Sequence, residues 1–328
     1  MSNNNMDLSP YIKISERDNF TIYSYPKKYL ELFLDELFYQ KSIEINDDHT
    51  FKMSKNGYII DNFNKESSVD FEYLRQSQIA VYWIHEWYDY LIKNSDNKNI
   101  TFKTKLIELS NEDIESLFNF KTYGIIPESL LKIIDDSITE INNLCFVRTD
   151  AYSPKDLVFE NKIDNLKVSD ALTAIKLITD SERCCQKLFS NDQIISKYLA
   201  IREYVNLDTN YEFRCFIYNW NLRAICQSGF EYNSELHAKK KIIRDSILKF
   251  WNKFESICPY SECTMDIIYD NNFKNTLNDS CIMVIEFNSF GPHMNADSGL
   301  YDWDRDYILL TKSNQPHFLL AEKPLNTI

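Results

Sequence analysis

The hydrophobic pattern changes character about halfway along the chain. In the first half, apolar residues recur mainly at helical spacing, and they predict helices over residues 27–40, 78–94 and 127–141, with one alternating strand over 101–109. In the second half, short apolar runs predict strands over residues 144–148, 198–205, 211–218, 222–227, 264–269 and 282–288. Helices are expected over 169–178, where Ser169 would be the N-cap, and over 233–257. A helical part followed by antiparallel strands backed by helices is typical of an α+β fold.

Glycine is scarce, with 5 residues in a chain of 328, and this excludes two common nucleotide-binding motifs. A GxGxxG loop and a P-loop both need two or more glycines within a few residues, whereas the closest pair here, Gly291 and Gly299, is eight positions apart. If the protein binds a nucleotide, side chains must therefore hold the phosphates.

The net charge is −13, from 36 Lys and Arg against 49 Asp and Glu. Nucleic-acid binding depends on neutralising phosphates, so this charge argues against it. The one basic run, Lys239–Lys241, is expected to be a solvated helix face.

No apolar run approaches the ~20 residues of a membrane helix, and the polar start lacks the features of a signal sequence. We therefore expect a monomeric cytoplasmic protein without membrane contacts, whose eight cysteines are free thiols.

Three oxygen-bearing side chains lie at corresponding places in two apolar strands. Glu286 and Asn288 share one face of CIMVIEFN, and Asp266 interrupts TMDII. Hard oxygen ligands in this number suit a Mg²⁺ ion that keeps some waters and is shared with a substrate phosphate. The alternative interpretation is that each residue is a buried polar group satisfied by its neighbours.

Cationic side chains lie on or beside neighbouring strands. Glu212 and Arg214 share a face of YEFRCFIY, and a buried carboxylate and guanidinium are costly unless they are paired or bind a ligand. The other cations are Arg148, Lys155 and Arg202. Together with the metal ligands, they predict a triphosphate site that needs no glycine loop, because Arg and Lys both bind phosphate oxygens. Taken singly, each cation also has an interpretation as a surface ion pair.

Several of these segments carry a resemblance to a known family. They are FVRTDAYSPKD, LAIREYVNLDTNYEFRCFIYNWNLRAICQ, MDII and VIEFNSFGPHMNADSGLYDW, with Trp87-Tyr88 and FKTKLIELS upstream. In this order, from Ile79 to Tyr307, they resemble the cell division cycle protein 123 family. The chain departs from the family pattern at Ser228, where members commonly carry Arg, and at Glu286, where Asp is usual.

The resemblance implies an ATP-grasp fold, in which two α+β subdomains with mostly antiparallel sheets enclose a nucleotide cleft that binds ATP and Mg²⁺. It places the core at residues 77–310, between an N-terminal extension of 1–76, partly helical, and a C-terminal tail of 311–328. By resemblance, the residues that contact ATP include Arg148, Asp150, Ala151, Glu212, Arg214 and the adenine hinge Tyr204, Val205 and Asn206. Asp266, Glu286 and Asn288 match the Mg²⁺ ligands. Eukaryotic members of the family assemble translation initiation factor 2 by binding its gamma subunit.

Two classes of function remain open. The first is an ATP-binding chaperone for a protein partner such as the gamma subunit. The second is an ATP-grasp enzyme, a carboxylate–amine ligase or a phosphotransferase, since the ATP site alone does not discriminate the two. An enzyme also needs a group on the acceptor side, and the sequence shows no clear one. His293 is the one candidate, and its alternative interpretation is an ordinary loop histidine. In a third interpretation, the extension over 1–76 gives the family core a new partner.

Overall fold

The computed structural model describes residues 81, 83–95, 100–188, 197–273, 281–291, 297–303 and 305–323, together with five short strands nearer the start of the chain. These are β1 (Ser15–Arg17), β2 (Phe20–Ile22), β3 (Ile43–Ile45), β4 (Phe51–Met53) and β5 (Tyr58–Ile59). Strands β1, β2 and β5 form one sheet, and β3 pairs with β4. The helix predicted over 27–40 lies outside the described residues.

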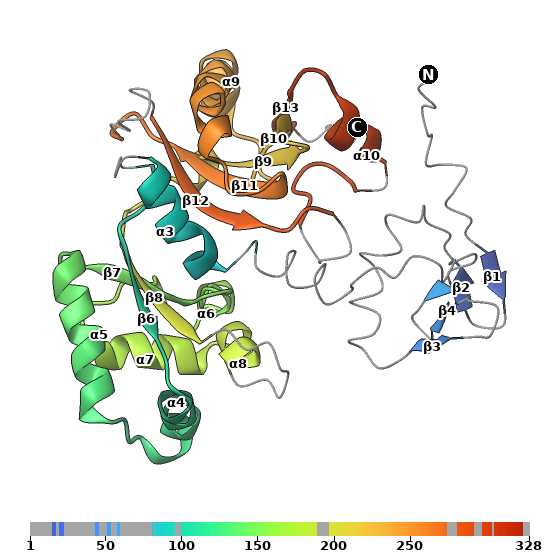
Figure 1. Ribbon diagram of the computed structural model, residues 1–328. Helices are drawn as coiled ribbons and strands as arrows, with labels where there is room; N and C mark the ends of the chain where they lie inside the picture. The colour runs from blue at the N-terminus through green and yellow to red at the C-terminus, as the bar shows by residue number, and fades with distance from the viewer. Residues whose placement is uncertain are drawn as a thin grey trace.

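A five-stranded sheet forms the larger part of the core, in the order β12-β11-β9-β10-β13 (Figure 1). Its strands are β9 (Glu212–Tyr218), β10 (Asn221–Gln227), β11 (Glu262–Tyr269), β12 (Ile282–Asn288) and β13 (His317–Leu319). All neighbours are antiparallel except β10 and β13. The strands predicted over 211–288 are confirmed to within two residues. The sheet also includes β13 from the predicted C-terminal tail, so the folded core continues beyond residue 310.

A second, three-stranded antiparallel sheet has the order β6-β8-β7. Its strands are β6 (Thr104–Glu108), β7 (Cys145–Thr149) and β8 (Tyr198–Glu203). The helices that accompany it are α4 (Asn111–Tyr123), α5 (Glu128–Ile141), α6 (Asp156–Phe159), α7 (Ala171–Asp180) and α8 (Glu182–Leu188). Apolar side chains of α4, α5, α7 and α8 pack with one face of this sheet. Its other face carries Arg148 and Arg202 toward the five-stranded sheet.

The five-stranded sheet is covered on both faces. Helices α3 (Ile84–Asn94) and α9 (Ser234–Phe254) pack on one face against Phe213, Cys215 and Ile217 of β9. Helix α10 (Tyr307–Lys312) contributes to a smaller cluster on the opposite face, around Phe216. Because side chains alternate along a strand, that opposite face of β9 also carries Glu212 and Arg214. This places the two charged residues away from α9.

Local capping explains where several helices begin. Pro127 precedes α5, and Asn233 caps α9 by accepting a hydrogen bond from the Leu236 backbone. The N-cap of α7 lies one residue later than predicted: it is Asp170 rather than Ser169, and the Asp170 side chain accepts a hydrogen bond from the Thr173 backbone. Helix α4 was not predicted, since only one of its residues is buried and its apolar stripe is weak.

All eight cysteines are free thiols, as predicted, and six of them are buried. In the part of the chain that the structure describes, no helix combines the length and the apolar character that crossing a bilayer requires.

Candidate functional site

A row of charged side chains crosses three neighbouring strands of the five-stranded sheet. Arg214 of β9 lies opposite Asp266 of β11, and Asp266 lies opposite Glu286 of β12. Cross-strand partners point to the same face of a sheet, so the three side chains form one line. Asn288, two residues beyond Glu286, lies on that face opposite Thr264. The predicted convergence of Asp266, Glu286 and Asn288 is therefore confirmed.

Asp266 is the centre of this row. Its buried carboxylate accepts hydrogen bonds from Nε and Nη2 of Arg214, each at 2.8 Å. Nδ2 of Asn288 donates a third hydrogen bond to it at 3.1 Å. Burial alone lowers the pKa of Arg214, but the charges of Asp266 and Asp297 outweigh burial and raise that pKa. The Arg214 guanidinium therefore stays charged, and the bidentate contact holds both side chains in a fixed geometry.

A second ion pair joins this row to the three-stranded sheet. Nη1 of Arg148, on β7, lies 2.5 Å from Oε2 of Glu286, on β12. Nη2 of Arg148 donates to the carbonyl oxygen of Ala151 at 2.9 Å. Burial raises the pKa of Glu286, but the positive charges of Arg148 and Lys155 more than offset it, so the pKa is lowered. Arg148 and Glu286 thus form a charged pair between the two sheets.

The charges around Glu212 are only partly balanced within the protein. Burial is the largest cause that raises the pKa of Glu212, and repulsion from Asp266 and Glu286 adds to it, against the lowering effect of Lys155. The hydroxyl of Ser228 donates to Glu212 at 3.1 Å. The Lys155 ammonium has no hydrogen-bond partner among the described residues, and it acts on Glu212 and Glu286 through its charge alone. This ammonium is therefore free to bind a ligand anion.

The loop after β7 directs the Asp150 carboxylate toward the start of α3. Its Oδ1 accepts the backbone N–H of His85 at 3.0 Å, and its Oδ2 contacts Nδ1 of the same ring. That ring stacks on Tyr198, with 4.4 Å between the centroids. The carboxylate of Asp150 is thus engaged by a residue that the sequence did not single out. Its contact with ATP stays a prediction.

We expect His85 to titrate above its ordinary pKa of about 6.5. Burial lowers the pKa of this imidazole, but the hydrogen bond and the charge of Asp150 outweigh burial, so the pKa is raised. A raised folded pKa means that the pair stabilises the fold fully below about pH 6.5 and loses this effect as the pH rises through the folded pKa. An NMR titration of the His85 ring measures it, and Asp150→Asn should lower the midpoint. A wild-type midpoint at or below 6.5 contradicts this.

Arg202 lies between the two sheets rather than in the charged row. Its guanidinium donates to the carbonyl oxygen of Ile285 at 2.9 Å and to Oγ1 of Thr104 at 3.2 Å. Burial and repulsion from Arg148 lower its pKa to about 9. Arg202 therefore connects β8 to β12 through hydrogen bonds within the protein, and its predicted phosphate contact stays a prediction.

The segment Tyr204, Val205 and Asn206 follows β8 and leads from the three-stranded sheet toward β9. The backbone N–H of Tyr204 donates to the carbonyl oxygen of Leu144 at 3.2 Å. Val205 packs against an apolar cluster that includes Phe102, whereas Asn206 is exposed. This is the connecting position that the family resemblance implies for a hinge. Its contact with adenine stays a prediction.

Asp297 completes the site and was not predicted. Nη1 of Arg214 donates to its carbonyl oxygen at 2.5 Å and lies 3.3 Å from its carboxylate. The carboxylate also accepts the backbone N–H of Gly299 at 2.9 Å. Gly299 has a φ of +58°, and an added Cβ would lie 2.7 Å from Sγ of Cys226, so only glycine fits. The Asp-Ser-Gly sequence over 297–299 is a turn signal that could have pointed to this loop.

The predicted metal site consists of two carboxylates and one amide, from Asp266, Glu286 and Asn288. Within the described ranges, no group of three or more His, Cys, Asp and Glu is arranged to hold a metal ion. The third oxygen of the predicted set comes from Asn288. Opposite Asn288, the buried hydroxyl of Thr264 has no hydrogen-bond partner among the described residues. Two features fit a bound cation: the Thr264 hydroxyl without a described partner, and the repulsion by which Asp266 and Glu286 help to raise the pKa of Glu212. The available Lys155 ammonium fits an anion bound beside that cation. His293 lies outside the described residues.

Comparisons with known proteins match a large part of the chain. A family model described as D123 matches residues 71–323. The translation initiation factor eIF2 assembly protein of Dictyostelium discoideum is 26% identical over 219 residues, which are 63% of this chain and 49% of that protein. Its namesake in Xenopus tropicalis is 26% identical over 189 residues, 54% of this chain and 53% of that protein. The match thus spans about half the length of these relatives.

The structure of Cdc123 from Schizosaccharomyces pombe superposes with a TM-score of 0.63 at 20% sequence identity. The match covers 76% of this chain and 98% of that chain. It confirms the predicted fold class, two α+β parts with mostly antiparallel sheets.

Proposed function

Since the chain belongs to the D123 family, we propose that it binds ATP with Mg²⁺ and acts in the cytoplasm as a monomeric chaperone in the assembly of translation initiation factor 2. The relatives that it resembles are named for this assembly. The gamma subunit is the partner that the family resemblance favours. Residues 1–76 would be an extension outside the nucleotide-binding core.

The observation that carries the ATP proposal is the row Arg214–Asp266–Glu286 with Lys155 beside it. Oxygen atoms of Asp266, Glu286 and Asn288 would hold Mg²⁺. The metal ion would neutralise phosphate charge and orient the phosphates. Arg148, Arg214 and Lys155 would contact phosphate oxygens, and because the two arginines are already paired with carboxylates, their positions are fixed before a nucleotide binds. The remaining proposed contacts are Asp150, Ala151, Arg202, Glu212 and the hinge Tyr204, Val205 and Asn206.

Lys155→Ala provides the most selective test of ATP binding. We expect it to weaken Mg²⁺–ATP binding by about 1.5–3 kcal/mol, the range for a hydrogen bond to a charged group. Among the residues that the structure describes, the ammonium has no hydrogen-bond partner, so the substitution breaks no hydrogen bond there. Calorimetry with ATP, with and without Mg²⁺, measures the affinity. Lys162→Ala is the matched control, since Lys162 is an exposed lysine that pairs with Glu160 nearby.

Two results would contradict the ATP proposal: equal ATP affinity with and without Mg²⁺, or equal losses of affinity in Lys155→Ala and Lys162→Ala.

The protein partner is tested in a separate experiment. Purified gamma subunit of translation initiation factor 2 should be retained by the immobilised full chain, and ATP should be hydrolysed negligibly during binding. If the chain does not retain this subunit but releases ADP with a carboxyl- or amino-bearing acceptor, the chaperone proposal is wrong and the ligase alternative replaces it.

A further inference from the structure

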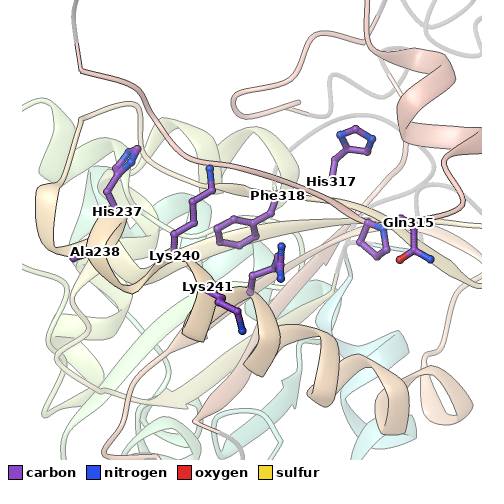
Figure 2. Close-up of a pocket in the computed structure, with 9 residues that line it drawn as sticks. His237, Ala238, Lys240, Lys241, Gln315, His317 and Phe318 are labelled. Atoms are coloured by element: carbon purple, nitrogen blue, oxygen red, sulfur yellow. The ribbon is translucent and has the colours of Figure 1, made fainter.

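A basic groove lies between α9 and the edge strand β13, on a different part of the molecule from the charged row. Its volume is about 760 Å³. Helix α9 contributes Lys240, Lys241 and Arg244, and the chain around β13 contributes residues 315–318. Figure 2 shows the Lys240 side chain extending from α9 beside the ring of Phe318. The groove is therefore a surface shared by a helix and a strand.

The basic run of the sequence divides between two environments. Lys239 pairs with Glu235 at 2.5 Å and donates to the hydroxyl of Tyr211, away from the groove. Lys240 and Lys241 line the groove instead. The expected solvated face is thus correct for the exposed Lys241, but Lys240 is half-buried.

The groove keeps a net positive charge within a chain of net charge −13. Among the residues that the structure describes, Lys241 and Arg244 share a single acidic partner, Asp245, at 2.7 and 2.9 Å. Lys240 has no ion pair or hydrogen bond within the described ranges. Three cations therefore face one carboxylate. A half-buried ammonium without a partner gains from a ligand anion more than an exposed, paired one does.

Among the described strands, the one beside these cations lies at the edge of its sheet. β13 pairs with β10 in parallel, through His317, Phe318 and Leu319, and no other described strand lies along its second edge. The backbone groups on such an edge can pair with an added strand. Protein partners use this mode of recognition when an extended peptide extends a sheet, and side-chain contacts then supply specificity.

We propose that the α9–β13 groove binds an extended acidic segment of a partner protein, which adds as a strand along β13 and places carboxylates against Lys240, Lys241 and Arg244. The cations follow a helix beside a strand edge, and Asp245 already engages two of them. This arrangement suits a linear ligand with spaced charges better than one compact phosphate group. Because α9 covers the face of the sheet opposite Arg214 and Asp266, the groove is separate from the proposed ATP site and does not depend on it.

The probe for this site is a fluorescein-labelled peptide of alternating Val and Glu, titrated with the full chain and followed by fluorescence anisotropy. We expect binding that weakens as salt is raised, since salt screens exposed charges. The same peptide with alternate backbone nitrogens methylated should not bind, because methylation removes the donors that pair with a strand edge. The corresponding Val and Lys peptide should not bind either.

Lys240→Glu should weaken binding of the acidic peptide at least about tenfold, because it places like charges together. Lys253→Glu is the matched control. It makes the same charge change on the same helix, at an exposed position outside the groove, and should leave the affinity unchanged. Neither variant should alter Mg²⁺–ATP binding.

The proposal is overturned if the acidic peptide does not bind, if the methylated peptide binds equally well, or if both variants lose the same affinity. It is also overturned if inositol hexakisphosphate binds with the same dependence on Lys240 while the peptide does not. In that case the groove is a phosphate site.

Discussion

Replacing Asp266 with alanine is expected to lower the free energy of unfolding by about 3–5 kcal/mol, because it leaves the Arg214 guanidinium buried without its main partner. Asp266 accepts both bonds of the bidentate pair, and the Arg214 side chain is only 11% exposed. The same change removes a proposed Mg²⁺ ligand, so Mg²⁺–ATP should no longer raise the melting temperature. Urea unfolding measures the first effect, and a melting series against Mg²⁺–ATP measures the second.

Asp297→Ala is the matched control for the stability effect. Its carboxylate contacts the same guanidinium at 3.3 Å, but the side chain is 63% exposed, so solvent screens the pair. The expected loss is about 0–1 kcal/mol. Equal losses in the two variants would contradict the assignment of Asp266 as the main partner. A folded Asp266→Ala protein that Mg²⁺–ATP still stabilises would contradict the proposed metal site.

Period-two alternation was sufficient to predict which polar residues of one strand share a face. Glu212 and Arg214 on β9, and Glu286 and Asn288 on β12, are each two residues apart, so each pair had to share a face. The register between strands could not be read in the same way. It depends on hydrogen bonds between segments far apart in the chain, and only the folded sheet places Asp266 opposite both Arg214 and Glu286.

The contacts between the two sheets had no local signal. The partners of the Arg148–Glu286 pair are 138 positions apart, and those of the His85–Asp150 contact are 65 apart. Each depends on how one whole layer packs on another. The short strand β13 was missed because three residues are too few for an alternating pattern to appear.

The Arg148–Glu286 pair predicts how stability depends on pH. The pKa of Glu286 is lowered in the folded protein from its ordinary value of about 4.5, chiefly because Arg148 offsets the effect of burial. A lowered folded pKa means that the pair stabilises the fold above about pH 4.5 and loses this contribution as the pH falls toward the folded pKa. Glu286→Gln should therefore unfold more easily than wild type near pH 7. Urea unfolding at a series of pH values should show the difference shrinking below about pH 4.5.

The size of the pair's contribution is measured by removing each partner alone and then both. Arg148→Met leaves the Glu286 carboxylate between two sheets without its cation, and should cost about 3–5 kcal/mol near pH 7. The double variant Arg148→Met/Glu286→Gln contains no unpaired charge at this place, so it should recover most of that loss. Additive losses in the double variant would mean that the two groups do not interact. If the losses are strongly non-additive, Arg148 and Glu286 act as one charged connection between the sheets, and a nucleotide that binds either residue also acts on both sheets.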